Sequence, residues 1–136
     1  MIDQLRKQPL LGLALLLLFT PAAHASRVTV GTYRTGTPST EAFSGVLRAL
    51  AQEGFVIKST DKSQGTVQAD RMAWGTGTAA FSVFVTVGKE GDATSIEPTF
   101  TKNPGIVGSS SDKWANAFGR ELKVAFPDIT VNLVKR

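Results

Sequence analysis

Few side chains in this 136-residue chain are arranged as in a catalytic site, and the closest match is Ser110-Ser111-Asp112-Lys113. A serine one helical turn before a lysine can be activated by a neutral amine, as in penicillin-recognising enzymes. Those enzymes also need a second serine motif and a Lys-Thr-Gly strand, and the sequence has neither. The pattern is more typical of a serine-rich loop that ends in a helix cap. An enzyme built on Ser110 and Lys113 is therefore disfavoured.

The acidic residues offer two weaker candidate sites. Glu90 and Asp92 lie in a predicted turn, but their spacing is not that of a calcium-binding loop, and a solvated hairpin tip explains it. Asp70 and Glu97 could act as the carboxylate pair of a glycosidase only if the fold brought them together. We therefore expect neither a metal site nor a cofactor.

The first 25 residues have the pattern of a secretory signal peptide. Arg6 and Lys7 form a short basic region, an apolar run follows over residues 10–19, and Ala23-His24-Ala25 is a small-residue cleavage site. The alternative is a membrane anchor, but an apolar run of that length covers only about half of the hydrocarbon core of a bilayer. We therefore expect a cleaved signal peptide over residues 1–25 and a single domain over residues 26–136.

Cleavage would remove His24, the only histidine, and the chain contains no cysteine. The exported domain would then lack the commonest general base, any thiol nucleophile, any disulfide and any lipidated cysteine. Because small domains released from the cell more often carry disulfides, we expect a periplasmic location, with secretion as the alternative. The formal net charge of +4 comes from scattered rather than clustered basic residues, so we expect no nucleic-acid partner.

Hydrophobic periodicity predicts two helices with one apolar face each. The first is expected to start at Thr37-Pro38, with the threonine as cap, and to end at a left-handed Gly54. The second is expected to follow a cap at Ser111 or Asp112 and to end before Pro127. The predicted apolar faces consist of Phe43, Val46, Leu47 and Leu50 in the first helix, and of Trp114, Ala117, Phe118, Leu122 and Ala125 in the second.

Alternating polar and apolar residues predict six strands, at 27–33, 55–60, 66–70, 79–87, 93–101 and 129–134. Because Pro98 has no N–H to donate, the strand that contains it is expected to lie at a sheet edge or to be bulged. Short turns join the second to fifth strands and predict an antiparallel meander. The expected fold class is therefore α+β, in the order β-α-β-β-β-β-α-β, with both helices packed on one face of the sheet.

The residues favoured for binding a partner lie in and beside a predicted loop between the third and fourth strands. Gly75 and Gly77 make this loop flexible, and Met72 and Trp74 fall outside any amphipathic period. Phe84 points away from the apolar face of its strand. If Phe84 lies on a solvated face near the loop, these residues form an exposed apolar patch suited to a protein partner. The competing interpretation is that Trp74 folds over the edge of the core.

One stretch of the chain combines a helix end, a turn and a return strand: Ala49-Leu50-x-x-x-Gly54-Phe55-x-Ile57-x-x-x-Asp61-x-x-x-Gly65-x-Val67-x-Ala69. This stretch resembles a pattern in small bacterial envelope domains, such as the helix-grip domains of the outer-membrane assembly lipoprotein BamC and related domains of unknown function. The resemblance covers roughly a third of the expected domain. It implies a helix-grip-like fold and a non-catalytic accessory or adaptor role. This chain differs from BamC in having one domain and no lipidated cysteine.

Three classes of function follow from these observations. The favoured class is a non-catalytic periplasmic accessory or protein-binding domain of the envelope, with inhibitor and immunity proteins as a subclass. The alternative is a carrier of a small apolar or cell-wall ligand held between helix and sheet. The third is a hydrolase that uses carboxylates or the Ser110–Lys113 pair. We expect a partner protein of the envelope and no membrane span in the mature chain.

Overall fold

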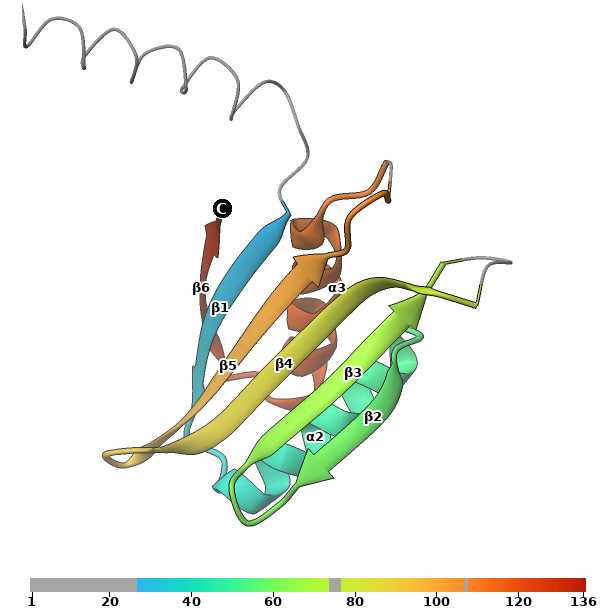
Figure 1. Cartoon of the computed structure of the whole chain (residues 1–136). Helices are drawn as coiled ribbons and strands as arrows, with labels where there is room; N and C mark the ends of the chain where they lie inside the picture. The colour runs from blue at the N-terminus through green and yellow to red at the C-terminus, as the bar shows by residue number, and fades with distance from the viewer. Residues whose placement is uncertain (1–26, 74–76, 107) are drawn as a thin grey trace, which may run out of the picture.

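A computed structural model describes residues 27–73, 77–106 and 108–136, which form a sheet of six strands and two helices (Figure 1). The element order is the predicted β-α-β-β-β-β-α-β, so the α+β fold class is confirmed. The helices are α2 (Ser39–Gln52) and α3 (Ser111–Ala125). The strands are β1 (Val28–Thr35), β2 (Val56–Asp61), β3 (Thr66–Met72), β4 (Ala79–Glu90), β5 (Ala93–Lys102) and β6 (Thr130–Lys135).

The strands form one antiparallel sheet in the order β2-β3-β4-β5-β1-β6. The meander from β2 to β5 is confirmed, and β1 lies between β5 and β6, so β2 and β6 are the two edges. Both helices lie on the same side of the sheet, with α3 against β1 and β5 (Figure 1). The opposite side is called the open face below. A sheet covered on one side only is the predicted architecture.

The end of α2 matches the sequence prediction. Gly54 adopts a left-handed backbone conformation with φ of 85°, which favours glycine. Its N–H donates to the carbonyl of Ala51 at 3.0 Å, and the N–H of Phe55 donates to the carbonyl of Leu50 at 2.9 Å. These two bonds form a Schellman motif, which satisfies carbonyls at the helix end and turns the chain toward β2.

The start of α2 differs from the prediction by one residue. Pro38 is the N-cap, and the N–H of Ala42 donates to its carbonyl at 2.9 Å. Thr37 does not cap the helix because its polar groups are used elsewhere. Its carbonyl accepts from the hydroxyl of Thr94 at 2.6 Å, and its N–H donates to the hydroxyl of Thr35 at 3.1 Å. The helix therefore begins after a threonine that is tied to the sheet.

The start of α3 also differs from the prediction, this time by one residue in the other direction. Ser110 is the N-cap, and Ser111 is already helical and fully buried. The Ser111 and Thr29 hydroxyls are hydrogen-bonded at 2.7 Å inside the protein, which draws the first turn of the helix onto β1. At the other end, Ala125 is exposed rather than on the apolar face, and the buried Phe126 that follows it supplies the contact.

The prediction for Pro98 was wrong, because β5 lies inside the sheet between β4 and β1. On the β4 side, Pro98 pairs with Val85 in an unbroken register. On the β1 side, pairing stops opposite Gly31 and resumes in the same register, so the strand is not bulged. A Cβ added at Gly31 would lie 3.3 Å from the Pro98 ring. The missing N–H is therefore accommodated by a gap in one ladder, beside a residue without a side chain.

The third and fourth strands both extend beyond their predicted ends. The third continues to Met72, which pairs with Ala79 after a register shift, so Met72 is not part of a loop. The fourth continues to Glu90, which pairs with Ala93, and this leaves a tight turn with Gly91 at φ of 65°. In both cases continued pairing with a neighbouring strand extends an element beyond its hydrophobic alternation.

The space between the helices and the sheet is filled by interlocking aromatic and aliphatic side chains. Phe118 of α3 meets Tyr33 and Phe100 edge-on, with ring centroids 5.7 and 5.6 Å apart. The Tyr33 hydroxyl donates to the carbonyl of Ala115 at 3.1 Å, and burial raises the pKa of Tyr33 well above its ordinary value. The largest fully buried side chains are Tyr33, Phe100, Phe118, Leu50, Ile96, Leu122, Val46, Val67, Val83, Val85, Thr29 and Pro98.

The pKa values of two carboxyl groups near the helix ends are shifted in opposite directions. Asp128, between α3 and β6, accepts from the Gly36 N–H at 2.8 Å and from the Thr35 hydroxyl at 2.7 Å. These bonds hold the pKa of Asp128 below its ordinary value. Partial burial, followed by a hydrogen bond and repulsion from Glu121, raises the pKa of Glu53. The folded protein therefore favours the charged form of Asp128 and the neutral form of Glu53.

Candidate functional site

The residues predicted to bind a partner occupy separate parts of the fold. Trp74 and Gly75 lie outside the described residues. Met72 ends β3 and is 39% exposed, and Gly77 precedes β4 with a left-handed φ of 73°. Phe84 is in the middle of β4 and is 45% exposed. Phe84 therefore lies on the solvated face of the sheet, as the sequence pattern indicated.

Met72 and Phe84 do not form one patch. Phe84 pairs with Gln68 on one side and Thr99 on the other, whereas Met72 pairs with Ala79. Ala79 and Phe84 are five positions apart on β4, so Met72 and Phe84 are separated by about 16 Å along the sheet. The described part of the predicted patch is thus divided between the end of the sheet and its centre.

The open face is largely polar, with isolated apolar side chains. One row of residues in register crosses five strands from β3 to β6, and it contains Gln68, Phe84, Thr99, Val30 and Val134. Within this row Phe84 lies between two polar side chains, whereas Val134 and Val30 are adjacent. Val134 is 48% exposed. Within this row the adjacent apolar residues therefore lie at the β6 side, while Val56, 49% exposed, is a separate apolar residue at the β2 edge.

The catalytic candidate at the start of α3 is not assembled. The Ser110 hydroxyl donates to the carboxylate of Asp112, and this bond is the main cause of the lowered pKa of Asp112. The Lys113 amine lies 4.8 Å from the centroid of the Trp114 ring and 3.5 Å from the Ser109 hydroxyl. The serine and the lysine are each engaged with other groups, as expected for a helix cap rather than for an activated nucleophile.

The acidic candidates are also dispersed. Glu90 forms an ion pair with Arg34 at 2.6 Å beside the β4–β5 turn. Asp70 and Glu97 lie on β3 and β5, and their partners on the intervening β4 are four positions apart. Their separation is therefore on the order of 16 Å, beyond the range found in glycosidases. Within the described ranges, no group of three or more His, Cys, Asp or Glu side chains is placed to hold a metal ion.

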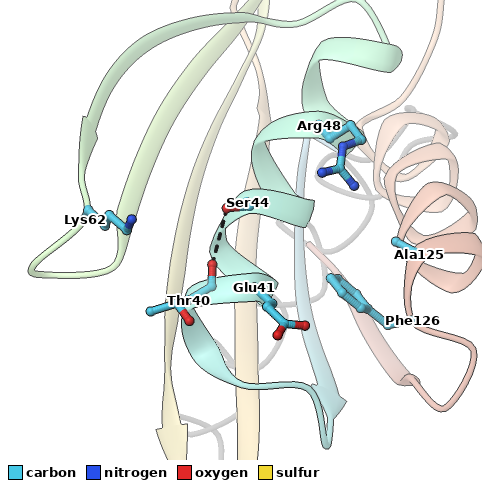
Figure 2. Close-up of a pocket in the computed structure, with 7 residues that line it drawn as sticks. All are labelled: Thr40, Glu41, Ser44, Arg48, Lys62, Ala125 and Phe126. Carbon is cyan, nitrogen blue, oxygen red and sulfur yellow. Dashed lines mark hydrogen bonds between the residues drawn. The ribbon is translucent and has the colours of Figure 1, made fainter.

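A surface pocket of about 440 Å³ lies between α2, the β2–β3 turn and the end of α3 (Figure 2). Arg48 and Lys62 contribute positive charge to its wall, and Glu41 contributes negative charge. The Ser44 hydroxyl donates to the carbonyl of Thr40 at 3.3 Å. The sequence did not reveal this pocket because its wall comes from three segments that are distant in the chain. Its lining consists of Thr40, Glu41, Ser44, Arg48, Lys62, Ala125 and Phe126.

The two edge strands of the sheet differ in how well they are protected against pairing with another strand. In β2, the register shifts between Ile57 and Ser59, and the exposed Lys58 lies at this irregularity. Bulges and edge lysines both discourage the addition of a further strand. In β6, all six residues pair with β1 without a shift, and Val131 and Val134 are 49% and 48% exposed. The β6 edge is therefore the more regular and the more apolar of the two.

The hydrogen-bond pattern shows which backbone groups of β6 face outward. Val28 and Arg136 exchange both of their backbone hydrogen bonds, at 2.7 and 3.2 Å. Because bonded and non-bonded pairs alternate in an antiparallel ladder, the N–H and C=O groups of Val131, Leu133 and Lys135 point away from β1. These three residues present the hydrogen-bonding groups that a further strand would use.

An apolar groove of about 230 Å³ runs between α3 and β6. Gly119 allows the close approach of α3 that forms it, since a Cβ at this position would lie 3.3 Å from the Tyr33 ring. Arg120 and Lys123 of α3 provide its basic rim. The groove is lined by Tyr33, Ala115, Asn116, Gly119, Arg120, Lys123, Val131 and Leu133. Periodicity predicted β6 as a strand, but only the strand order places it beside α3.

Neither a protein-family model nor a curated protein matches this chain. The resemblance to helix-grip domains of the BamC type therefore stays a prediction. Across residues 27–73, 77–106 and 108–136, no helix is both long and apolar enough to cross a membrane.

Proposed function

We propose that this protein is a non-catalytic protein-binding domain of the bacterial envelope, exported to the periplasm through a cleaved signal peptide. The β6 edge carries this proposal. It combines a regular strand with outward backbone groups, exposed valines on both of its faces and an adjacent apolar groove. Monomeric proteins usually protect such an edge, so its exposure favours a role in pairing with another protein.

The arrangement of reactive side chains supports a binding role. Ser110 and Lys113 are engaged with other groups, and Asp70 and Glu97 are far apart. The core beneath the helices is filled by aromatic side chains, which leaves the surface for recognition. An inhibitor or immunity protein would belong to this class, because such proteins act by occupying a surface of their target.

Site-specific crosslinking in intact cells tests this function. A photoreactive amino acid is placed at Val131 on the β6 edge, at Phe84 on the open face, or at Thr60 on the bulged β2 edge as the matched control. We expect one dominant adduct with an envelope protein from position 131 or 84 and none from position 60. Equal labelling from all three positions, or no adduct from any, would contradict a protein-binding role.

Export is tested by fractionating the same cells. The intact mass of the protein from the periplasmic fraction is expected to correspond to a chain that begins at Ser26. Cytoplasmic recovery of the chain with its first 25 residues still attached would contradict the proposed location.

A second candidate function is supported by the pocket beside α2. Its wall contains two basic side chains, Arg48 and Lys62, against one acid, Glu41, together with hydroxyl groups, so it fits a small anionic cell-wall fragment better than an apolar molecule (Figure 2). Soluble muropeptides should then shift the amide resonances of residues 40–48. The R48A/K62A variant should lose this response, and the exposed Lys58→Ala control should retain it. Unchanged spectra at millimolar muropeptide would refute the carrier function.

A further inference from the structure

We propose that β6 accepts an extended acidic segment of a partner protein as a seventh strand, with alternate side chains lying in the α3–β6 groove. This inference rests on the proposed protein-binding function and adds to it the place of contact and the chemistry of the partner. Strand addition of this kind draws affinity from backbone hydrogen bonds and specificity from the pockets beside the edge.

Two residues of β6 whose backbone groups point outward also have side chains that line the groove. Val131 and Leu133 direct their N–H and C=O groups outward, and their side chains also line the groove. A partner residue that pairs directly opposite either of them projects its side chain on the same face of the sheet. Every second side chain of an added strand would therefore be placed at the groove, and the intervening ones beside Val134 on the open face.

The charge around the groove selects the partner. Arg120 and Lys123 are exposed, and neither lies within 4 Å of a carboxylate oxygen in the described part of the chain. Asp112 is paired with Lys135 at 3.2 Å, and the oxygens of Asp128 accept from the β1–α2 connection. Arg120 acts on Glu53 and Lys123 acts on Asp128 at longer range, in each case favouring the charged carboxylate. The rim therefore presents two basic groups that form no ion pair with either acid. Glutamate side chains fit this site because their methylenes can cover the apolar floor while the carboxylates reach the rim.

The same charges disfavour the other possible occupants. Pairing of β6 with β6 of a second copy would bring two sets of Arg120 and Lys123 to one interface, and like charges at an interface oppose association. The N-terminal residues of this chain carry Arg6 and Lys7 and no neighbouring acid beyond Asp3, so they lack the complementary charge. An acidic segment of a different protein matches the site best.

Model peptides test the inference on the protein purified from the envelope fraction. The probe is a capped ten-residue peptide of alternating glutamate and valine, followed by NMR titration of the labelled protein. We expect shifts centred on the amides of Val131, Leu133 and Lys135. The matching lysine–valine peptide should bind about tenfold more weakly, because its charges repel the rim. N-methylation of alternate peptide nitrogens should also weaken binding about tenfold, since it removes the pairing donors.

Variants of the protein separate charge from folding. R120E/K123E should weaken binding of the acidic peptide about tenfold and should strengthen binding of the lysine peptide. The matched control K58E/K89E makes the same charge change at two exposed lysines away from β6 and should leave both affinities unchanged. All four positions are exposed, so unchanged melting temperatures are expected and will show that the folds are intact.

Three results of the NMR titration would overturn the inference. The first is equal affinity for the acidic and basic peptides, or no shift at β6 with either. The second is a response centred on β2 or on Phe84. The third is a concentration-dependent shift at β6 without peptide, which would identify a second copy as the occupant. Capture of a partner from position 84 but not from position 131 would overturn this inference and leave the proposed function intact, whereas failure of all crosslinks would count against the proposed function.

Discussion

The contact between α2 and the end of α3 depends on a glycine inside a helix, and replacing it gives a sharp test of the packing. Gly45 is buried in α2, and an added Cβ would lie 2.3 Å from Cζ and 2.7 Å from Cε2 of Phe126. Glycine in a helix interior costs about 1 kcal/mol relative to alanine, so Gly45→Ala would stabilise an exposed helix by that amount. Here the contact with Phe126 opposes the gain.

Either response of Phe126 to Gly45→Ala is more costly than the helical gain. If the ring stays in place, the overpacked contact costs about 1–3 kcal/mol. If the ring swings into the neighbouring pocket, it loses burial that contributes about 1.5–3 kcal/mol. We therefore expect a net destabilisation of about 1 kcal/mol and a melting temperature lower by about 4 °C for a domain of this size.

Denaturant unfolding of the single and double variants provides the assay. In the Phe126→Leu background the clash is relieved, so Gly45→Ala should become stabilising by up to about 1 kcal/mol. Ser44→Ala, at the neighbouring exposed position in the same helix, is the control and should show only the small propensity effect. Stabilisation by Gly45→Ala in the unaltered protein, or the same effect in both backgrounds, would refute this account of the α2–α3 contact.

Two further predictions concern pH. The pKa of Asp128 is lowered in the folded protein. Its contribution to the stability of the fold is therefore present at pH values above its ordinary pKa of 3.8 and is lost as the pH falls through its pKa in the folded protein. Asp128→Asn should therefore lower the melting temperature most at pH 7, with a gap that narrows below about pH 4, whereas Asp92→Asn in the β4–β5 turn should have little effect. The pKa of Glu53 is raised, so the neutral acid favours the folded state. This contribution to the stability of the fold is lost as the pH rises above the ordinary pKa of 4.5. Glu53→Gln should be more stable than the unaltered protein at pH 7, with no difference near pH 4. Melting curves between pH 3 and 8 check both, and a constant offset across this range would contradict either assignment.

Local signals in the sequence predicted the ends of elements well where the hydrogen bonds are made between residues close together in the chain. The end of α2 at Gly54 was predictable because a left-handed glycine followed by an apolar residue defines a Schellman motif within the chain itself. The helix starts were each displaced by one residue because their caps depend on distant partners. The Thr94 hydroxyl donates a hydrogen bond to the carbonyl of Thr37, and the hydroxyls of Thr29 and Ser111 are hydrogen-bonded to each other.

The candidate site shows the same division between local and distant information. Alternation placed Phe84 on the solvated face, but it could not show that Met72 lies about 16 Å away, since that distance depends on the pairing of β3 with β4. The α3–β6 groove was also hidden from the sequence. Its walls come from β1, α3 and β6, and their adjacency follows from strand order rather than from any motif.

The sequence by itself determined the α+β class, the order of the elements, most of the apolar face of each helix and the absence of cysteine. These properties follow from periodicity and composition, which need no knowledge of distant contacts. The tertiary structure decided that β5 is central despite Pro98 and that β6 is a regular edge beside a basic groove. Strand order decides both, because it determines which backbone groups are paired and which are left for a partner.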